Sequence, residues 1–218
     1  MRFLVTRPRP GADATAAALA ALGHDALVMP LSRTVPLPWP VPDTAPDAVM
    51  ITSAAALRHA GAAALRWRHL PLLAVGGATA EAARAVGFSD VREGAGTVQQ
   101  LLDGLAAAGP LCLLHLAGED RTPVTAPAHI VLDVRPVYAA RLLPMPALPL
   151  ADVALVYSAR TGRHFAAEWD RLGGDRAALG LVAISPAALA AAGTGWRETR
   201  CAAAPTEAAM LALAVQNA

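Results

Sequence analysis

The chain contains an internal repeat, and this feature constrains its fold more than any other. The run Asp47-Ala-Val-Met-Ile-Thr-Ser53 returns 105 residues later as Asp152-Val-Ala-Leu-Val-Tyr-Ser158. Two shorter pairs follow in the same order, each 109 residues apart. Three matches in order indicate two copies of one supersecondary unit. The shorter pairs are Ala74-Val-Gly76 with Ala183-Ile-Ser185, and Thr97-Val-Gln-Gln-Leu-Leu102 with Thr206-Glu-Ala-Ala-Met-Leu211.

Each copy has the pattern of alternating strands and helices. Continuous apolar runs such as 48–51 and 153–156 are typical of strands that are buried on both faces of a parallel sheet. Ser53, Thr97 and Thr206 stand where helix N-caps belong. The helices expected between the strands cover 54–66, 78–86, 98–108, 159–172, 186–192 and 206–216.

The remaining segments predict how the two copies form two domains. Apolar strands are expected at 4–6 and 26–29, around a helix at 11–22, and again at 111–116 and 130–134. Each domain reaches about five strands only if the opening strands pair with the second copy, which makes one domain discontinuous. We therefore expect a two-domain α/β protein with a discontinuous lobe at 1–30 plus 146–218, an inserted lobe at 37–133, and proline-flanked linker segments at 31–36 and 134–145.

Composition limits the class of protein. Hydrophobic residues make up 55% of the 218 residues, which is ample for two cores. A formal net charge of +1 provides no broad attraction for nucleic acid or a membrane surface. The uncharged stretch from Ala177 to Trp196 is interrupted by Gly180, Pro186 and Gly193, so it predicts a strand and a short helix rather than a membrane span. We expect a cytoplasmic protein without a signal peptide.

The common catalytic motifs are missing from the sequence. There is no phosphate-binding glycine loop and no Gly-x-Ser-x-Gly elbow, and Gly94-Ala-Gly96 lacks the third glycine of a dinucleotide site. The six histidines have no metal-ligand spacing, and the two cysteines form no paired motif. These absences argue against nucleotide, acyl-enzyme and metal chemistry.

Hydroxyl and glycine residues follow several predicted strands where helices begin. The free N–H groups of helix starts bind anions, and open α/β sheets bind ligands at the carboxyl ends of their strands. For any one position, helix capping alone is the alternative interpretation. Because such residues recur at equivalent positions in both copies, we interpret them as a candidate site for carboxylates, formed by Thr52, Ser53, Gly76, Gly77, Thr79, Ser158 and Ser185.

Two arginines and two tyrosines complete the candidates. Arg7 and Arg121 each follow a predicted buried strand, where they either bind anionic groups or lie on a solvated surface. Tyr138, in the returning linker, either packs the hinge or has a polar role. Tyr157 ends an apolar run and is expected to line the core.

Several of these segments resemble the uroporphyrinogen-III synthase family. The matches extend from residue 5 to the last helix, and the Gly76–Thr79 segment together with the Val137-Tyr138 pair is the most specific part. The other matching segments are Val5-Thr6-Arg7-Pro8, Asp47 to Leu57, Ala183-Ile-Ser-Pro186 and Ala204-Pro-Thr206.

The resemblance implies two flavodoxin-like lobes, that is, doubly wound parallel sheets, joined by a two-stranded linker. It implies a cofactor-free lyase of tetrapyrrole (heme) biosynthesis that cyclises hydroxymethylbilane to uroporphyrinogen III, with inversion of ring D and loss of water. Tyr138 is then the candidate proton donor to the leaving hydroxyl. The hydroxyl and glycine residues, with Arg7 or Arg121, would bind the substrate. A cytoplasmic monomer that transiently contacts hydroxymethylbilane synthase is expected.

The chain departs from the family pattern at two places. Ala187-Ala188 follow Ser185-Pro186 where relatives often carry threonines, so a hydroxyl contact is lost. Pro123 and Pro127 predict a truncated helix within 121–138. A two-lobed small-molecule binding module and a catalytically silent homologue are the alternatives. The missing signal peptide and the few aromatic residues weigh against the binding module.

Overall fold

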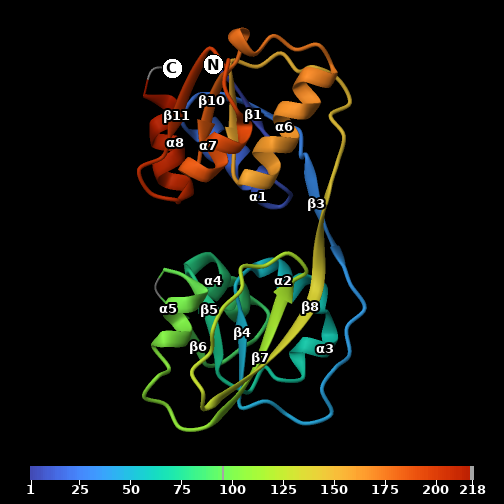
Figure 1. The fold of residues 1–218 in the computed structure, drawn as a ribbon, viewed down its shortest axis with the longest axis vertical. Coiled ribbons are helices and arrows are strands. Elements are labelled where there is room, and N and C mark those ends of the chain that lie inside the picture. Colours follow the sequence, from blue (N-terminus) through green and yellow to red (C-terminus); the bar gives the residue numbers. More distant parts are fainter. Residues whose placement is uncertain (95, 217–218) are drawn as a thin grey trace. The chain divides into compact units, whose positions relative to one another are not determined.

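The computed structural model describes residues 1–94 and 96–216, which form two compact units (Figure 1). The discontinuous unit contains residues 1–33 and the chain from 141 onward, and the inserted unit contains residues 34–140. The chain passes between them through β3 (Ser32–Pro36) and β8 (Ile130–Leu142). Each boundary therefore falls within a strand, where the sequence predicted linker segments.

The discontinuous unit has a parallel sheet in the order β11-β10-β9-β1-β2. Phe165 and Ala188 pack on one face, and Leu19 and Met210 pack on the other, so helices cover both faces. The strands are β1 (Arg2–Val5), β2 (Asp25–Val28), β9 (Val153–Val156), β10 (Gly180–Ala183) and β11 (Glu198–Cys201), and the helices are α1 (Gly11–Ala21), α6 (Ala159–Arg171), the 3-10 turn η1 (Arg176–Ala178), α7 (Pro186–Ala192) and α8 (Glu207–Val215).

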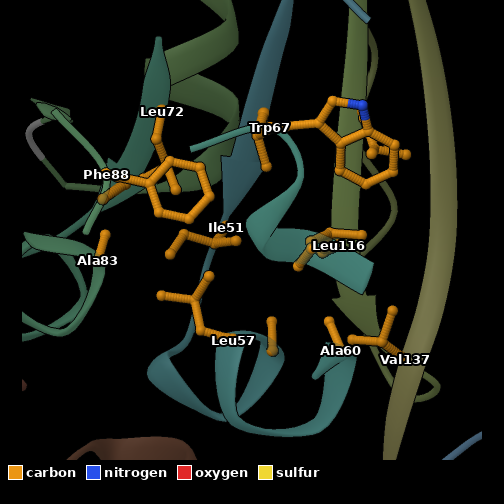
Figure 2. Packing of buried hydrophobic residues seen from close by; sticks show 14 of the residues in the cluster. Ile51, Leu57, Ala60, Trp67, Leu72, Ala83, Phe88, Leu116 and Val137 are labelled. Carbon is orange, nitrogen blue, oxygen red and sulfur yellow. The ribbon is translucent and has the colours of Figure 1, made fainter. Parts of the chain in front are cut away.

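The inserted unit has its sheet in the order β3-β8-β7-β4-β5-β6. Ile51, Trp67 and Phe88 belong to the cluster on one face (Figure 2). Met50 and Leu102 belong to the cluster on the other face. The remaining strands are β4 (Ala48–Ile51), β5 (Leu72–Val75), β6 (Val91–Gly94) and β7 (Leu111–Gly118), and the helices are α2 (Ala54–Ala60), α3 (Ala62–Leu65), α4 (Gly77–Ala85) and α5 (Val98–Asp103).

Read in the opposite direction, the inserted sheet has the order β6-β5-β4-β7-β8-β3. Apart from β3, these strands match β11-β10-β9-β1-β2 one for one, with β7 in the place of β1 and β8 in the place of β2. A matching pair of aspartates marks this equivalence. The Asp152 carboxylate accepts a hydrogen bond from the Arg2 N–H at 2.7 Å, and the Asp152 N–H donates to the Arg2 carbonyl at 2.9 Å. Asp47 makes the same two bonds to Cys112, also at 2.7 and 2.9 Å. The aspartate that opens each sequence repeat therefore anchors the first strand of the other half of its sheet.

Three of the predicted elements differ in length from the observed ones. The helix expected at 54–66 is broken at Gly61, whose φ of +64° stops α2. The helix expected at 98–108 ends at Asp103, before Gly104, whereas the strand expected at 130–134 continues to Leu142.

The truncated helix expected after Arg121 is absent, because no helix lies between β7 and β8 in the described chain. The Gln99 side chain instead binds the extended segment there. It accepts from the Thr125 N–H at 2.9 Å and donates to the Thr125 carbonyl at 2.9 Å. A side-chain amide thus satisfies backbone groups that a helix would have paired.

Other expectations are confirmed. The strands 48–51 and 153–156 have the predicted bounds, and Ser53, Thr97 and Thr206 are N-caps. The uncharged stretch from Ala177 to Trp196 contains β10 and α7. Within the described residues, every helix is too short or too polar to cross a membrane.

Candidate functional site

Most of the predicted site residues lie at the carboxyl edge of the inserted sheet. β4 and β7 are neighbours, and the chain leaves β4 toward β5 but leaves β7 toward β8, on the opposite side. In open α/β sheets, such a switch point is where ligands bind. Thr52 and Ser53 follow β4 directly, and Gly76 and Gly77 follow the adjacent β5.

Tyr138 lies at this edge, near the end of β8. It pairs with Gly118 at the end of β7, and a β-carbon at position 118 would come within 3.0 Å of the Tyr138 ring. Glycine at 118 therefore gives the tyrosine its place. The His59 ring, from α2, stacks on Tyr138 with ring centroids 5.9 Å apart, and its Nε2 lies 2.8 Å from the Thr34 hydroxyl.

Burial, followed by the charge of Arg58, lowers the pKa of His59, so this ring is neutral at pH 7. Sequence reasoning missed His59 and Thr34. A histidine in mid-helix and a threonine in an edge strand carry no local signal of their contact with a tyrosine far along the chain.

Arg121 lies at the same strand end. Its guanidinium folds back over the end of β7 and donates to the carbonyl of Glu119 at 3.2 Å and to that of Gly118 at 3.5 Å. Burial, and then the charge of Arg121, lower the pKa of the buried His115 to about 4. Arg121 is therefore a cation at the carboxyl edge, as its position after β7 predicted.

The start of α4 has the features of an anion site. Gly76 is its N-cap at a φ of +84°, and no side chain caps the helix. The first-turn N–H groups of such a helix have no intrahelical acceptor. Thr79 is buried and donates its N–H to the Gly76 carbonyl at 3.1 Å. The Glu93 carboxylate is near, since a β-carbon at Gly77 would lie 3.3 Å from its Oε1.

The predicted serines do cap helices. Ser53 accepts from the Ala55 N–H, Ser158 from the Thr161 N–H and Ser185 from the Ala188 N–H, at 3.2, 3.2 and 3.3 Å. The capping interpretation is thus confirmed for each oxygen. The Ser53 and Ser185 hydroxyls each still carry a hydrogen to donate, whereas the Ser158 hydroxyl is engaged with the Thr161 hydroxyl at 2.8 Å.

The discontinuous unit has its own switch point, between β1 and β9. Arg7 follows β1, and its guanidinium lies 4.5 Å from the centroid of the Tyr157 ring. Arg7 Nη1 is 2.9 Å from a carboxylate oxygen of Glu207, the first residue of α8. The Tyr157 and Glu207 side chains both contact the hydroxyl of Thr15 in α1.

The expectation that Tyr157 lines the core is confirmed, and its hydroxyl also belongs to a polar cluster. Its ring does pack against the core, but its hydroxyl lies 3.3 Å from the Thr15 hydroxyl within this polar cluster. Burial raises the pKa of Tyr157, so the hydroxyl stays protonated and can donate. The signal was its place directly after β9, which is the same rule that singled out Arg7.

One cavity lies away from the predicted site residues. A cavity of about 420 Å³ beside β6 and α5 is lined by Leu73, Glu93 and Leu101, among others, and includes none of the predicted site residues. Across the described chain, no three His, Cys, Asp or Glu side chains are grouped to hold a metal ion.

Parallel sheets covered by helices, with glycines, hydroxyls and arginines after the strands, define a protein of the α/β class. Its family follows from comparison with known sequences. The chain belongs to the family described as uroporphyrinogen-III synthase HemD, whose model matches residues 13–212. No curated protein matches the chain.

One solved structure supports the fold. The uroporphyrinogen-III synthetase of Helicobacter pylori is similar with a TM-score of 0.61 and 16% identity, over 99% of both chains. A mutant uroporphyrinogen III synthase of Thermus thermophilus is 17% identical over 92% of both chains, at a TM-score of 0.48. At this identity the first structure supports the α/β fold, and the second is too distant to add to it.

Proposed function

We propose that the chain is an active uroporphyrinogen-III synthase. It would act as a lyase that cyclises hydroxymethylbilane to uroporphyrinogen III, with inversion of ring D and loss of water, without a cofactor. The observation that carries this proposal is the family match over residues 13–212. The clustering of Tyr138, Arg121, Thr52 and the α4 start at one sheet edge supports it.

In this reaction, Tyr138 would protonate the departing hydroxyl so that water leaves. The Tyr138 ring is half-buried, stacks on His59 and packs closely against Gly118. These contacts would hold its hydroxyl in one position. A neutral His59 beside it adds no second positive charge to the site. General acid assistance of this kind is worth about 10²–10⁴-fold.

The carboxylate arms of the substrate would bind at the strand ends. The N–H groups at Gly76 and Gly77 suit a carboxylate, because helix starts carry partial positive charge. Thr79, Arg121 and the serines at 53, 158 and 185 would add hydroxyl and guanidinium donors. Holding the arms would present the hindered carbon of ring D to the terminal methylene, and well-oriented intramolecular reactions gain roughly 7–11 kcal/mol.

The fold and setting follow as part of the same proposal. We infer that both units are flavodoxin-like, because each five-strand set has the 2-1-3-4-5 order of that fold once β7 and β8 are placed first. A cytoplasmic monomer that receives its substrate from hydroxymethylbilane synthase completes the proposal.

The decisive experiment adds purified protein to freshly made hydroxymethylbilane and separates the oxidised products by isomer. Without inversion, the substrate closes to the symmetric type I isomer. We expect type III to predominate, with chelator present and no cofactor added. Type I alone, formed by folded protein at the rate of the blank, would contradict the proposal and favour a binding module or a silent homologue.

A further inference from the structure

The cluster at the switch point of the discontinuous unit is built around a carboxylate. Glu207 offers one oxygen to Arg7 Nη1 at 2.9 Å and the other to the Thr15 hydroxyl. The Thr15 hydroxyl also lies 3.5 Å from Arg7 Nη1 and 3.3 Å from the Tyr157 hydroxyl. A guanidinium and two hydroxyls thus converge where parallel sheets bind ligands.

The local backbone makes room for this arrangement. A β-carbon at Gly11 would lie 2.7 Å from Arg7 Nε, so only glycine leaves the guanidinium its position. Thr6, the residue before Arg7, is buried and donates its hydroxyl to the Leu155 carbonyl at 2.7 Å, which fixes the chain as it leaves β1. The Arg7 guanidinium lies over the Tyr157 ring, 4.5 Å from its centroid.

Glu207, by contrast, is partly exposed to solvent. It is the first residue of α8, its side chain is 36% exposed, and that of Arg7 is 28% exposed. Partly exposed ion pairs contribute little free energy, so an incoming carboxylate can replace this one. Thr206 caps α8 through the Ala209 N–H, so the helix does not need the Glu207 side chain to begin.

We infer that Arg7, Thr15 and Tyr157 form a carboxylate-binding site that Glu207 occupies as an internal competitor until a carboxylate arm of the substrate displaces it. The inference rests on the proposed function for its ligand class, a tetrapyrrole with acetate and propionate arms. A substrate with many arms suits such a site, because once one arm is bound the others meet their sites at high effective concentration.

The test compares Glu207→Gln with the wild-type chain in binding uroporphyrin I, an unreactive tetrapyrrole with eight carboxylates, by fluorescence titration. Removing the competitor should tighten binding about two- to fivefold, the range set by a partly exposed ion pair. Arg7→Gln should weaken binding, and Arg7→Gln/Glu207→Gln should show no gain over Arg7→Gln. Glu198→Gln, which breaks the Arg200 pair on β11, is the matched control and should leave binding unchanged.

Glu207→Ala provides a second variant, and a cooperative thermal transition is required of each protein. Equal affinity, weaker binding by the Glu207 variants, a gain that persists without Arg7, or no saturable binding at all would overturn the inference. Turnover separates it from the proposed function. Tighter Arg7-dependent binding by a chain that yields only type I product would leave this site standing and reject the synthase. With an active chain, Glu207→Gln should lower KM and leave kcat unchanged.

Discussion

Tyr138 differs from the predicted serines because it caps no helix. It lies at a strand end, opposite a glycine whose missing side chain leaves room for its ring. Tyr138→Phe keeps the His59 stack and the packing, so stability should be nearly unchanged. Turnover should fall toward the low end of about 10²–10⁴-fold, since this hydroxyl leaves readily without help.

Steady-state rates with the isomer ratio and a thermal melt check this expectation. Thr79→Ala is the companion variant. Thr79 does not cap α4, so a purely structural role predicts that Thr79→Ala loses about 1 kcal/mol of stability, the usual cost of a substitution, and keeps normal turnover. An unchanged rate for Tyr138→Phe would make Tyr138 a packing residue of the hinge.

His115 makes the folded state sensitive to acid. The ring is 3% exposed, and neither of its nitrogens has a hydrogen-bond partner among the described residues. Its pKa of about 4 lies below the ordinary 6.5, so the folded chain binds fewer protons than the unfolded chain. Stability is complete above pH 6.5 and declines as the pH falls toward 4, by about 3 kcal/mol in all.

His115→Leu should remove that part of the decline, because leucine has no proton to bind and leaves no unpaired nitrogen. Urea unfolding between pH 7.5 and 4 measures it. His69→Gln, at an exposed position, is the control and should keep the slope of the wild-type chain. A parallel slope for His115→Leu would contradict the argument.

At the scale of elements, the anchoring aspartates join strands that are far apart in sequence. Asp152 holds the start of β1 and Asp47 holds β7, each by a carboxylate that accepts a backbone N–H at 2.7 Å. Hydrogen bonds to charged groups contribute about 1.5–3 kcal/mol. Since both carboxylates are solvent-accessible, we expect Asp47→Ala or Asp152→Ala to lower the free energy of unfolding by about 1–2 kcal/mol.

Which strand loses its protection from hydrogen exchange tests the two anchors better than the size of the stability loss does. Hydrogen exchange should speed up in β1 for Asp152→Ala and in β7 for Asp47→Ala, with the opposite strand protected as before. Each variant is the control of the other. Equal exposure of both strands in either variant would contradict the equivalence of the two anchors.

The elements themselves were largely predictable. The apolar runs of β4 and β9 and the caps Ser53 and Thr206 are local signals, and the structure has them as expected. The loss of a helix after Arg121 was predictable only in part. Its prolines were visible, but the replacement bonds from Gln99 join residues 26 positions apart.

The candidate site follows the same division. Placement after a strand is a local property, and it put Arg7 and Arg121 at sheet edges. Tyr138 lies within β8 and was singled out by its place in the returning linker and by the family resemblance. Their neighbours are not local. The contact of Glu207 with Thr15, and that of His59 with Tyr138, depend on which helix lies beside which strand, and spacing along one chain does not contain this information.

Across the whole chain, the sequence repeat and the aspartate anchors relate different sets of strands. The repeat relates β4-β5-β6 to β9-β10-β11, and the aspartate anchors relate β7 to β1. Each sheet thus consists of a short half, β1-β2 or β7-β8, and a long half, β4-β5-β6 or β9-β10-β11. Along the chain, the halves come in the order short, long, short, long. In space, the first short half pairs with the last long half, and the inner two halves pair with each other.

This is the topology of a tandem duplication whose halves have been exchanged, an intramolecular domain swap. β3 and β8 are the segments that carry each short half away from the long half next to it in sequence. A break in the chain after Ala108 would leave two fragments, each with the equivalents of all five strands of one sheet. A single-unit protein with the sequence of either fragment would therefore contain all five strands. Two copies of it would form the same pair of sheets by exchanging halves.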